Sequence, residues 1–166
     1  MFHDLWREIE AAEDKKLPRV VAKVAEEYDD MMLSYEIVPD EAVDLLVRVF
    51  SFEPILNTKG LEHFLLEINV DLCKYTNAQR AKLFNALIEN AKYVKDELSR
   101  HSIGDFIARA FPSELALATF LALSEGTASE KHVAFVGIDV LRMRVPKDSV
   151  LYKKIIRKWS EMLNAK

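Results

Sequence analysis

The sequence predicts an all-α protein of eight or nine helices, because it has few turn residues and its apolar residues recur at helical spacing. Only 4 Gly and 5 Pro occur in 166 residues, too little turn material for a sandwich or barrel with many hairpins. Apolar residues recur three and four positions apart along most of the chain, and no segment shows sustained two-residue alternation. We therefore expect one helical domain over residues 1–166.

The first three helices are predicted from prolines and apolar stripes. A short amphipathic helix runs to about Ala12, and a second begins at Pro18 and continues to Tyr35. Proline is tolerated in a first helical turn, so Pro39 begins the third helix. Pro54 ends that helix, because proline lacks the backbone donor that a helix interior needs.

The next three helices follow a loop through Asn57 and Thr58. One occupies residues 59–75, and Thr76 with Gln79 then has the spacing of a capping box that opens another. After a break at 92–96, a further helix ends at Phe111 and Pro112.

The last three helices are predicted from their capping residues. Ser113 is expected to cap a buried core helix that contains the run LALATFLAL, and Thr127 with Glu130 repeats the capping-box spacing. Asp148 or Ser149 caps the final helix. The run VAFVGIDV is rich in β-branched residues, but helix-spaced apolar positions enclose it, so a strand there is the minority interpretation.

Two arrangements of these helices stay open. The segments LEHFLLEI and IGDFIARA, which start at residues 61 and 103, share aliphatic, acidic and aromatic positions. Antiparallel helix pairs in a short HEAT-like α-solenoid would produce such an echo, and an irregular bundle accounts for the pattern almost equally well. Gly104 and Gly137 lie inside helical patterns, which indicates close helix packing at these positions.

Several features predict a cytoplasmic protein with no membrane contact. A single cysteine cannot form an internal disulfide, so nothing indicates an oxidising compartment. The N-terminal residues MFHDLWREIEAAEDKK lack the basic and apolar regions of a targeting segment. The run LALATFLAL is far shorter than the ~20 residues that span a bilayer.

Charge is distributed unevenly along the chain. Residues 1–72 hold 17 acidic and 7 basic side chains, whereas residues 73–166 hold 10 acidic and 16 basic ones. Solvation of helix faces explains such clusters in general, but a concentrated acidic surface also attracts basic partners and speeds their encounter. We therefore expect a partner-binding surface in the acidic segment that runs from Glu26 to Asp44. Its predicted contact residues are Glu26, Glu27, Asp29, Asp30, Glu36, Asp40, Glu41 and Asp44.

Basic residues gather on the last two predicted helices. They are Arg142, Arg144, Lys147, Lys153, Lys154, Arg157 and Lys158. Such a surface suits phosphates, and Trp159 is near enough in sequence to stack on a base. The chain has no Gly-rich loop, no aromatic platform and a net charge of −4, which argues against nucleic acid as the partner.

Histidines and acids at helical spacing are the only candidates for chemistry. His63 and Glu67 are four residues apart, as are Glu97 and His101, and Asp105 follows one turn later. Each set shares a helix face, which indicates a surface ion pair or a helix hydrogen bond. The alternative is a metal site in a helical metalloenzyme, built from His63, Glu67, His101 and Asp105.

No motif for nucleophilic catalysis, phosphate cradling or dinucleotide binding occurs in the chain. Cys73 follows an apolar stripe with no histidine nearby, so we expect a small buried side chain there and no nucleophile. The sequence therefore predicts a protein that is not an enzyme and that needs no cofactor or metal.

The stretch from GLEHFLLEINVDLCKYTNAQR through LIENAKYV to SIGDFIARAFPSELALATFLAL resembles segments of small, acidic, all-helical bacterial proteins. Some proteins of this kind are immunity partners in contact-dependent growth inhibition and related toxin systems. The resemblance covers about half the chain and carries no catalytic residue across. It implies a cytoplasmic protein that binds one cognate toxin domain and masks it.

The leading hypothesis is thus an immunity or inhibitor protein that occludes a basic toxin or nuclease domain. A solenoid scaffold or regulator that binds a peptide or nucleic acid is the second hypothesis, and the helical metalloenzyme is the third.

Overall fold

The computed structural model describes residues 1–165, and all regular structure within this range is helical. This confirms the all-α prediction. Short 3-10 helices at Leu72–Lys74 (η1) and Ala91–Tyr93 (η2) join some of the α-helices. The α-helices are α1 Phe2–Glu10, α2 Leu17–Met32, α3 Asp40–Ser51, α4 Glu53–Leu56, α5 Leu61–Val70, α6 Asn77–Asn90, α7 Glu97–Ala110, α8 Ser113–Leu123, α9 Ala128–Arg144 and α10 Val150–Asn164.

Nine of these helices correspond to the nine segments expected from the sequence, and the short α4 is an addition. It has four residues and begins directly after Phe52. Pro54 ends no helix itself, because α3 ends at Ser51 and the proline lies in the first turn of α4. A proline there costs no hydrogen bond, because the first backbone N–H groups of a helix have no partner within it.

Most of the predicted caps form. The Thr76 hydroxyl accepts a hydrogen bond from the Gln79 backbone while the Gln79 side chain accepts one from Thr76. Thr127 and Glu130 make the same reciprocal pair at the start of α9. Ser149 caps α10 through the Tyr152 backbone N–H.

The predicted Ser113 cap is wrong. Pro112 occupies the capping position of α8 with an extended backbone, and Ser113 is already the first helical residue. The prediction of a buried core helix is correct only for one face of α8. Ala116, Leu117, Phe120 and Leu123 are buried, whereas Leu115 and Leu121 are exposed. The run VAFVGIDV is entirely helical within α9, so the prediction of a helix and not a strand there is confirmed.

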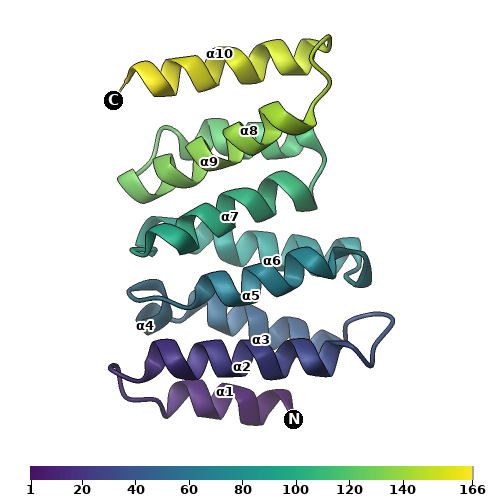
Figure 1. Ribbon diagram of the computed structural model, residues 1–166, viewed down its shortest axis with the longest axis vertical. Helices are drawn as coiled ribbons and strands as arrows, with labels where there is room; N and C mark the ends of the chain where they lie inside the picture. The colour runs from purple at the N-terminus through teal and green to yellow at the C-terminus, as the bar shows by residue number, and fades with distance from the viewer. Residues whose placement is uncertain (166) are drawn as a thin grey trace.

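The helices stack along the long axis of the molecule (Figure 1), with α1 at one end and α10 at the other. One row of helices consists of α2, α5, α7 and α9, each packed on the next, and α10 packs on α9. On the other side of the stack α3 packs on α6, and α8 packs on α9. The acidic and basic parts of the sequence therefore lie towards opposite ends of an elongated structure.

One continuous cluster of buried apolar side chains runs through the stack from Leu5 in α1 to Ile155 in α10. Its largest fully buried members are Tyr28, Phe50, Phe64, Phe106 and Phe120. Phe64 and Phe106 come from the two similar segments noted in the sequence, which form parts of α5 and α7. These two helices pack against each other.

Glycines allow close packing of α9 against α7 and α8. A Cβ added at Gly104 would lie 2.7 Å from the Val133 carbonyl oxygen and 3.0 Å from the Gly137 backbone nitrogen. A Cβ added at Gly137 would overlap the Phe120 ring of α8. The prediction that these glycines permit close packing is confirmed. Within residues 1–165, no helix is both long enough and apolar enough to cross a bilayer.

Candidate functional site

The acidic segment, residues 26–44, consists of the last turns of α2, a connecting loop and the start of α3. Asp40 and Glu41 lie in the first turn of α3, where the partial positive charge of a helix N-terminus stabilises carboxylates. The helix start thus explains two of the predicted acids without invoking a partner. For the other six acids, the tertiary structure decides which side chains lie beside them.

Hydrogen bonds with η1 and with the start of α6 hold the loop between α2 and α3. Lys74 Nζ donates to the Met32 carbonyl at 3.0 Å, and the Val38 N–H donates to the Lys74 carbonyl at 3.0 Å. The Gln79 amide, only 7% exposed, donates to the Val38 carbonyl at 2.8 Å and to Asp40 Oδ1 at 2.9 Å. These contacts hold the backbone that carries the acidic side chains in one conformation, which lowers the entropy lost on binding.

Some of the acidic side chains are neutralised within the chain. Lys23 Nζ lies 3.0 Å from Glu27 and 2.8 Å from Glu8 of α1, and Lys82 pairs with Asp44. Four others are exposed and make no ion pair with any residue in the range 1–165. These four, the unpaired carboxylates, are Glu26, Asp30, Glu36 and Glu41.

Asp29 faces α5 instead. Burial raises the pKa of Glu67, and the negative charge and hydrogen bonding of Asp29 raise it further. The acidic residues therefore have neighbours in three directions: α1, α5 and α6. That these acidic side chains form one continuous surface stays a prediction.

A groove borders the acidic segment between α1 and α3. Its volume is about 410 Å³. Arg48 lies 5.9 Å from the Trp6 ring centroid, and Phe52 packs edge-on against the same ring. Sequence reasoning missed this groove because its two walls are more than 30 residues apart and no local pattern joins them. The lining residues are Met1, Phe2, His3, Trp6, Glu41, Asp44, Leu45 and Arg48.

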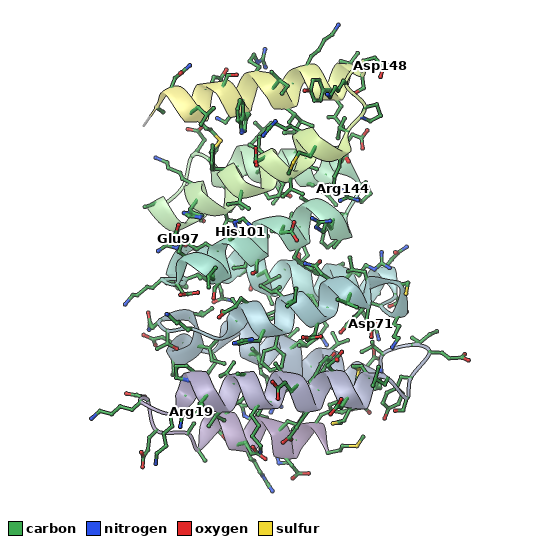
Figure 2. All side chains as sticks on the ribbon, viewed as in Figure 1. Arg19, Asp71, Glu97, His101, Arg144 and Asp148 are labelled. Carbon is green, nitrogen blue, oxygen red and sulfur yellow. The ribbon has the colours of Figure 1, made fainter. Side chains whose placement is uncertain are left out.

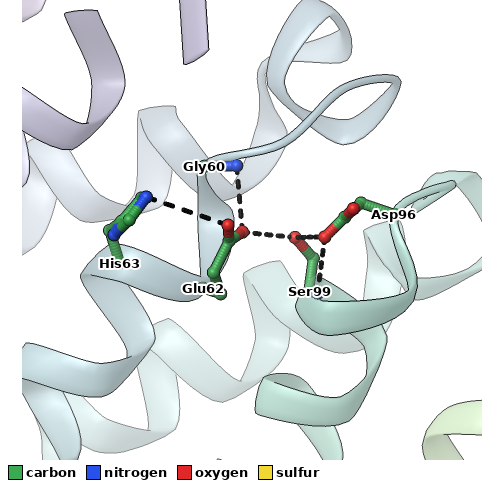
Figure 3. A network of polar contacts seen from close by, with 5 residues as sticks. All are labelled: Gly60, Glu62, His63, Asp96 and Ser99. Atoms are coloured by element: carbon green, nitrogen blue, oxygen red, sulfur yellow. Dashed lines mark hydrogen bonds and ion pairs between the residues drawn. The ribbon is translucent and has the colours of Figure 1, made fainter. Parts of the chain in front are cut away.

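The polar contacts of His63 differ from the predicted pair with Glu67. His63 Nε2 lies 3.8 Å from Glu62 Oε1, as Figure 3 shows. Glu62 Oε2 accepts a hydrogen bond from the Gly60 N–H at 2.9 Å, and Ser99 Oγ lies 2.9 Å from the same oxygen. Asp96 caps α7 through the Ser99 N–H at 2.9 Å. This network ties the start of α5 to the start of α7.

The second predicted set, Glu97, His101 and Asp105, does not form a common site either. Glu97 and His101 are exposed on successive turns of α7 (Figure 2), whereas Asp105 is held by Arg109 Nε at 2.7 and 2.8 Å. Among residues 1–165, no three His, Cys, Asp or Glu side chains are grouped so that they could hold a metal ion. The hypothetical metal site of His63, Glu67, His101 and Asp105 is therefore not assembled.

Cys73 is exposed, so the expectation of a buried side chain is wrong. It lies at the centre of η1, where the chain turns between α5 and α6. A three-residue turn directs only some of its side chains inward. Leu72 packs partly against the core, and Cys73 points outward.

The basic residues of α9 and α10 are partly engaged. Arg142 pairs with Asp139 at 2.7 Å and stacks over the Trp159 ring at 4.4 Å from its centroid. Lys158 lies 3.4 Å from Glu125. Lys147, Lys153 and Lys154 are exposed and make no ion pair with residues 1–165. Trp159, expected as a stacking residue for bases, already carries an arginine on its face.

A larger cleft of about 770 Å³ lies where α9 and the end of α10 diverge. Its lining combines apolar side chains such as Met162 with both acidic and basic ones, among them Glu161 and Lys131.

Comparisons of the chain with protein-family models, with curated proteins and with solved structures gave no match. A function for the chain is therefore inferred from its own surfaces.

Proposed function

We propose that this chain is a cytoplasmic protein-binding module of the immunity or inhibitor type. It covers the active or substrate-binding surface of a basic protein, such as a toxin or nuclease domain. The observation that carries the proposal is the set of unpaired carboxylates, Glu26, Asp30, Glu36 and Glu41, on and beside a loop fastened by Lys74 and Gln79. Charges without internal partners are available for pairing with a partner, and a fastened backbone loses little entropy when it binds.

The groove between α1 and α3 adds to this support. Glu41 contributes to its lining together with the apolar side chains of Phe2, Trp6 and Leu45. A lysine or arginine has an aliphatic stem that suits an apolar floor and a charged end that suits a carboxylate rim. The groove therefore fits an anchoring basic side chain from the partner.

Paired charge reversals test the proposal. The partner is first isolated by affinity capture with the wild-type chain, and its association rate is then measured with two double variants, Glu26→Lys with Asp30→Lys and Glu36→Lys with Glu41→Lys. We expect the rate to fall roughly tenfold at low salt in at least one double variant, with a smaller difference at high salt. The wild-type chain, but not that variant, is expected to inhibit the activity of the isolated partner.

The matched control reverses the same number of charges elsewhere. Glu89 and Glu114 are exposed and unpaired within residues 1–165, on α6 and α8. A variant with Glu89→Lys and Glu114→Lys is expected to bind like wild type. Equal rates for all three variants would rule out the acidic segment as the contact surface.

A scaffold that grips a peptide is the second candidate, and the 770 Å³ cleft beside α9 and α10 favours it. Its size lies within the range of small-ligand sites. Chemical-shift mapping with the isolated partner separates the two candidates. Perturbations at residues 26–44 support the inhibitor proposal, whereas perturbations confined to the cleft support the scaffold.

A further inference from the structure

A third hollow, a cavity of about 490 Å³, lies at the junction of α9 and α10. It is lined by the end of α9, the connecting loop and one residue of the first turn of α10. The lining contains two arginines, one lysine and no acidic side chain. Figure 2 shows Arg144 at the end of α9 and Asp148 on the loop that follows. The lining residues are Arg142, Met143, Arg144, Val145, Pro146, Lys147 and Tyr152.

Contacts within the chain hold both guanidinium groups in place. Arg144 donates a hydrogen bond to the Ala108 carbonyl at the end of α7. Arg142 donates to Asp139 Oδ1 at 2.8 Å through Nε, and its other face covers Trp159. An arginine has five N–H donors, so each of these side chains keeps donors free for a ligand. Their positions are fixed before any ligand binds.

The loop between the helices is also closed by hydrogen bonds. The Ser149 hydroxyl donates to the Pro146 carbonyl at 2.7 Å, and the Ser149 backbone N–H lies 3.1 Å from the same oxygen. The Tyr152 N–H then donates to Ser149 Oγ at 3.0 Å. The loop that lines the cavity is therefore held by its own hydrogen bonds.

The charge of the cavity is positive after internal pairs are taken into account. Asp139 compensates Arg142, whereas Arg144 and Lys147 make no ion pair within residues 1–165. Asp148 adjoins the loop but is not among the lining residues. α10 also begins here, and its N-terminus adds a partial positive charge.

We propose that this cavity binds the phosphate group of a small phosphomonoester. Two uncompensated positive charges match a phosphate dianion, and the planar fork of an arginine matches its oxygen atoms. The volume lies in the range of small-molecule sites, and the Tyr152 ring with Val145 and Pro146 supplies an apolar wall for the organic part. The same features hold a free phosphate ion more weakly, because an ion leaves that wall uncovered. This site is independent of the acidic segment and of any protein partner.

Titration of the isolated full-length chain tests the site. The probes are phenyl phosphate, inorganic phosphate and benzoate at constant ionic strength, followed by calorimetry and by NMR shifts of Tyr152. We expect phenyl phosphate to bind more tightly than inorganic phosphate, and both to bind more tightly than benzoate. Arg144→Gln is expected to weaken phenyl phosphate binding roughly tenfold, and Arg144→Lys to weaken it less, because the charge stays while the fork is lost.

Lys147→Gln provides a second test that avoids the Arg144 contact to α7. Lys147 is exposed and has no internal partner within residues 1–165, so its loss should leave the fold intact while weakening phenyl phosphate binding severalfold. Lys153→Gln and Lys154→Gln are the matched controls on α10, outside the lining. Equal losses in the cavity and control variants, or no saturable binding at millimolar phenyl phosphate, would overturn the proposal. Binding of a single-stranded oligonucleotide in place of the small anions, weakened by every one of these substitutions, would also overturn it.

Discussion

Helix α9 packs on two neighbours in contrasting ways. Towards α7 the contact is set by Gly104, because a Cβ added there would lie 2.7 Å from the Val133 carbonyl oxygen and 3.0 Å from the Gly137 backbone nitrogen. Towards α10 the contact is made by long side chains, and Ile155 is the only residue of α10 within the described range that is buried. A junction limited by backbone cannot adjust to added volume, whereas one made of long side chains can. The second junction is also where the cleft and the basic cavity open.

The largest expected effect comes from breaking the close junction. Gly104→Ala places a methyl group 2.7 Å from the Val133 carbonyl oxygen and 3.0 Å from the Gly137 backbone nitrogen of α9, and backbone atoms cannot move aside as the end of a side chain can. We expect the free energy of unfolding to fall by about 3 kcal/mol, measured by urea denaturation. Gly126→Ala is the control, because the atoms nearest its added Cβ all belong to the Glu130 side chain, and at most the hydrogen bond from the Thr127 N–H to that side chain is lost. A similar loss in both variants would mean that backbone freedom, not packing against the backbone of α9, explains the effect.

The loose junction is tested by removing its one buried anchor. Ile155→Ala deletes a fully buried side chain, and we expect a loss of about 2 kcal/mol. Because α10 is the last helix of the stack, this loss should show as faster amide exchange in α10 before global unfolding. Ile156→Ala, at a half-buried neighbour, is expected to have a smaller effect. Uniform acceleration of exchange across α7 and α9 would contradict the contrast between the junctions.

A hydrogen bond beside the start of α9 has an intermediate expected effect. The buried Ser129 hydroxyl lies 2.6 Å from the Ala91 carbonyl and 2.9 Å from the Val94 carbonyl. Ser129→Ala leaves these carbonyls without that donor, and we expect a loss of about 1 kcal/mol in thermal or urea unfolding. Ser102→Ala, at a half-buried position of α7, is the comparison. Equal stability of the two variants would show that a water molecule replaces the Ser129 hydroxyl as the donor.

The smallest expected effect concerns the junction of α2 with α5, where two carboxylates meet. Because burial and Asp29 raise the pKa of Glu67, protonation favours the folded state. Wild-type stability should therefore gain from this group as the pH falls towards its ordinary pKa of 4.5, and lose that gain as the pH rises. Glu67→Gln is expected to stabilise the chain by roughly 0.5 kcal/mol at neutral pH, since solvent screens the pair. Denaturant unfolding of both proteins across this pH range measures the difference. A variant less stable than wild type at neutral pH would contradict the raised pKa of Glu67.

Local signals were readable from the sequence alone. The capping pairs Thr76 with Gln79 and Thr127 with Glu130 formed as predicted, because each involves atoms only three residues apart. The prediction for Ser113 failed because α8 begins one residue earlier than expected, so that Pro112 takes the N-cap position without a side-chain hydrogen bond.

The candidate sites were less predictable. The acidic residues were identified from composition, but which of them stay unpaired depended on Lys23 and Lys82, and the latter lies on another helix. The expected partner of Glu67 was His63, on its own helix, yet after burial the largest effect on the pKa of Glu67 comes from Asp29 of α2, and His63 acts more weakly in the opposite direction. Spacing along one helix predicts neighbours on that helix only.

The sequence by itself determined the helical fold, most helix starts and the separation of acidic from basic regions, because these depend on residue type and on contacts within a turn or two. It did not determine all helix ends, because α2 stops at Met32 and α5 at Val70, short of the predicted Tyr35 and residue 75. Only the tertiary structure decided which charges were neutralised, that Cys73 is exposed, and where cavities open. Those outcomes depend on which helices stack together and on how closely glycines allow them to approach, and neither is encoded in any short stretch of the chain.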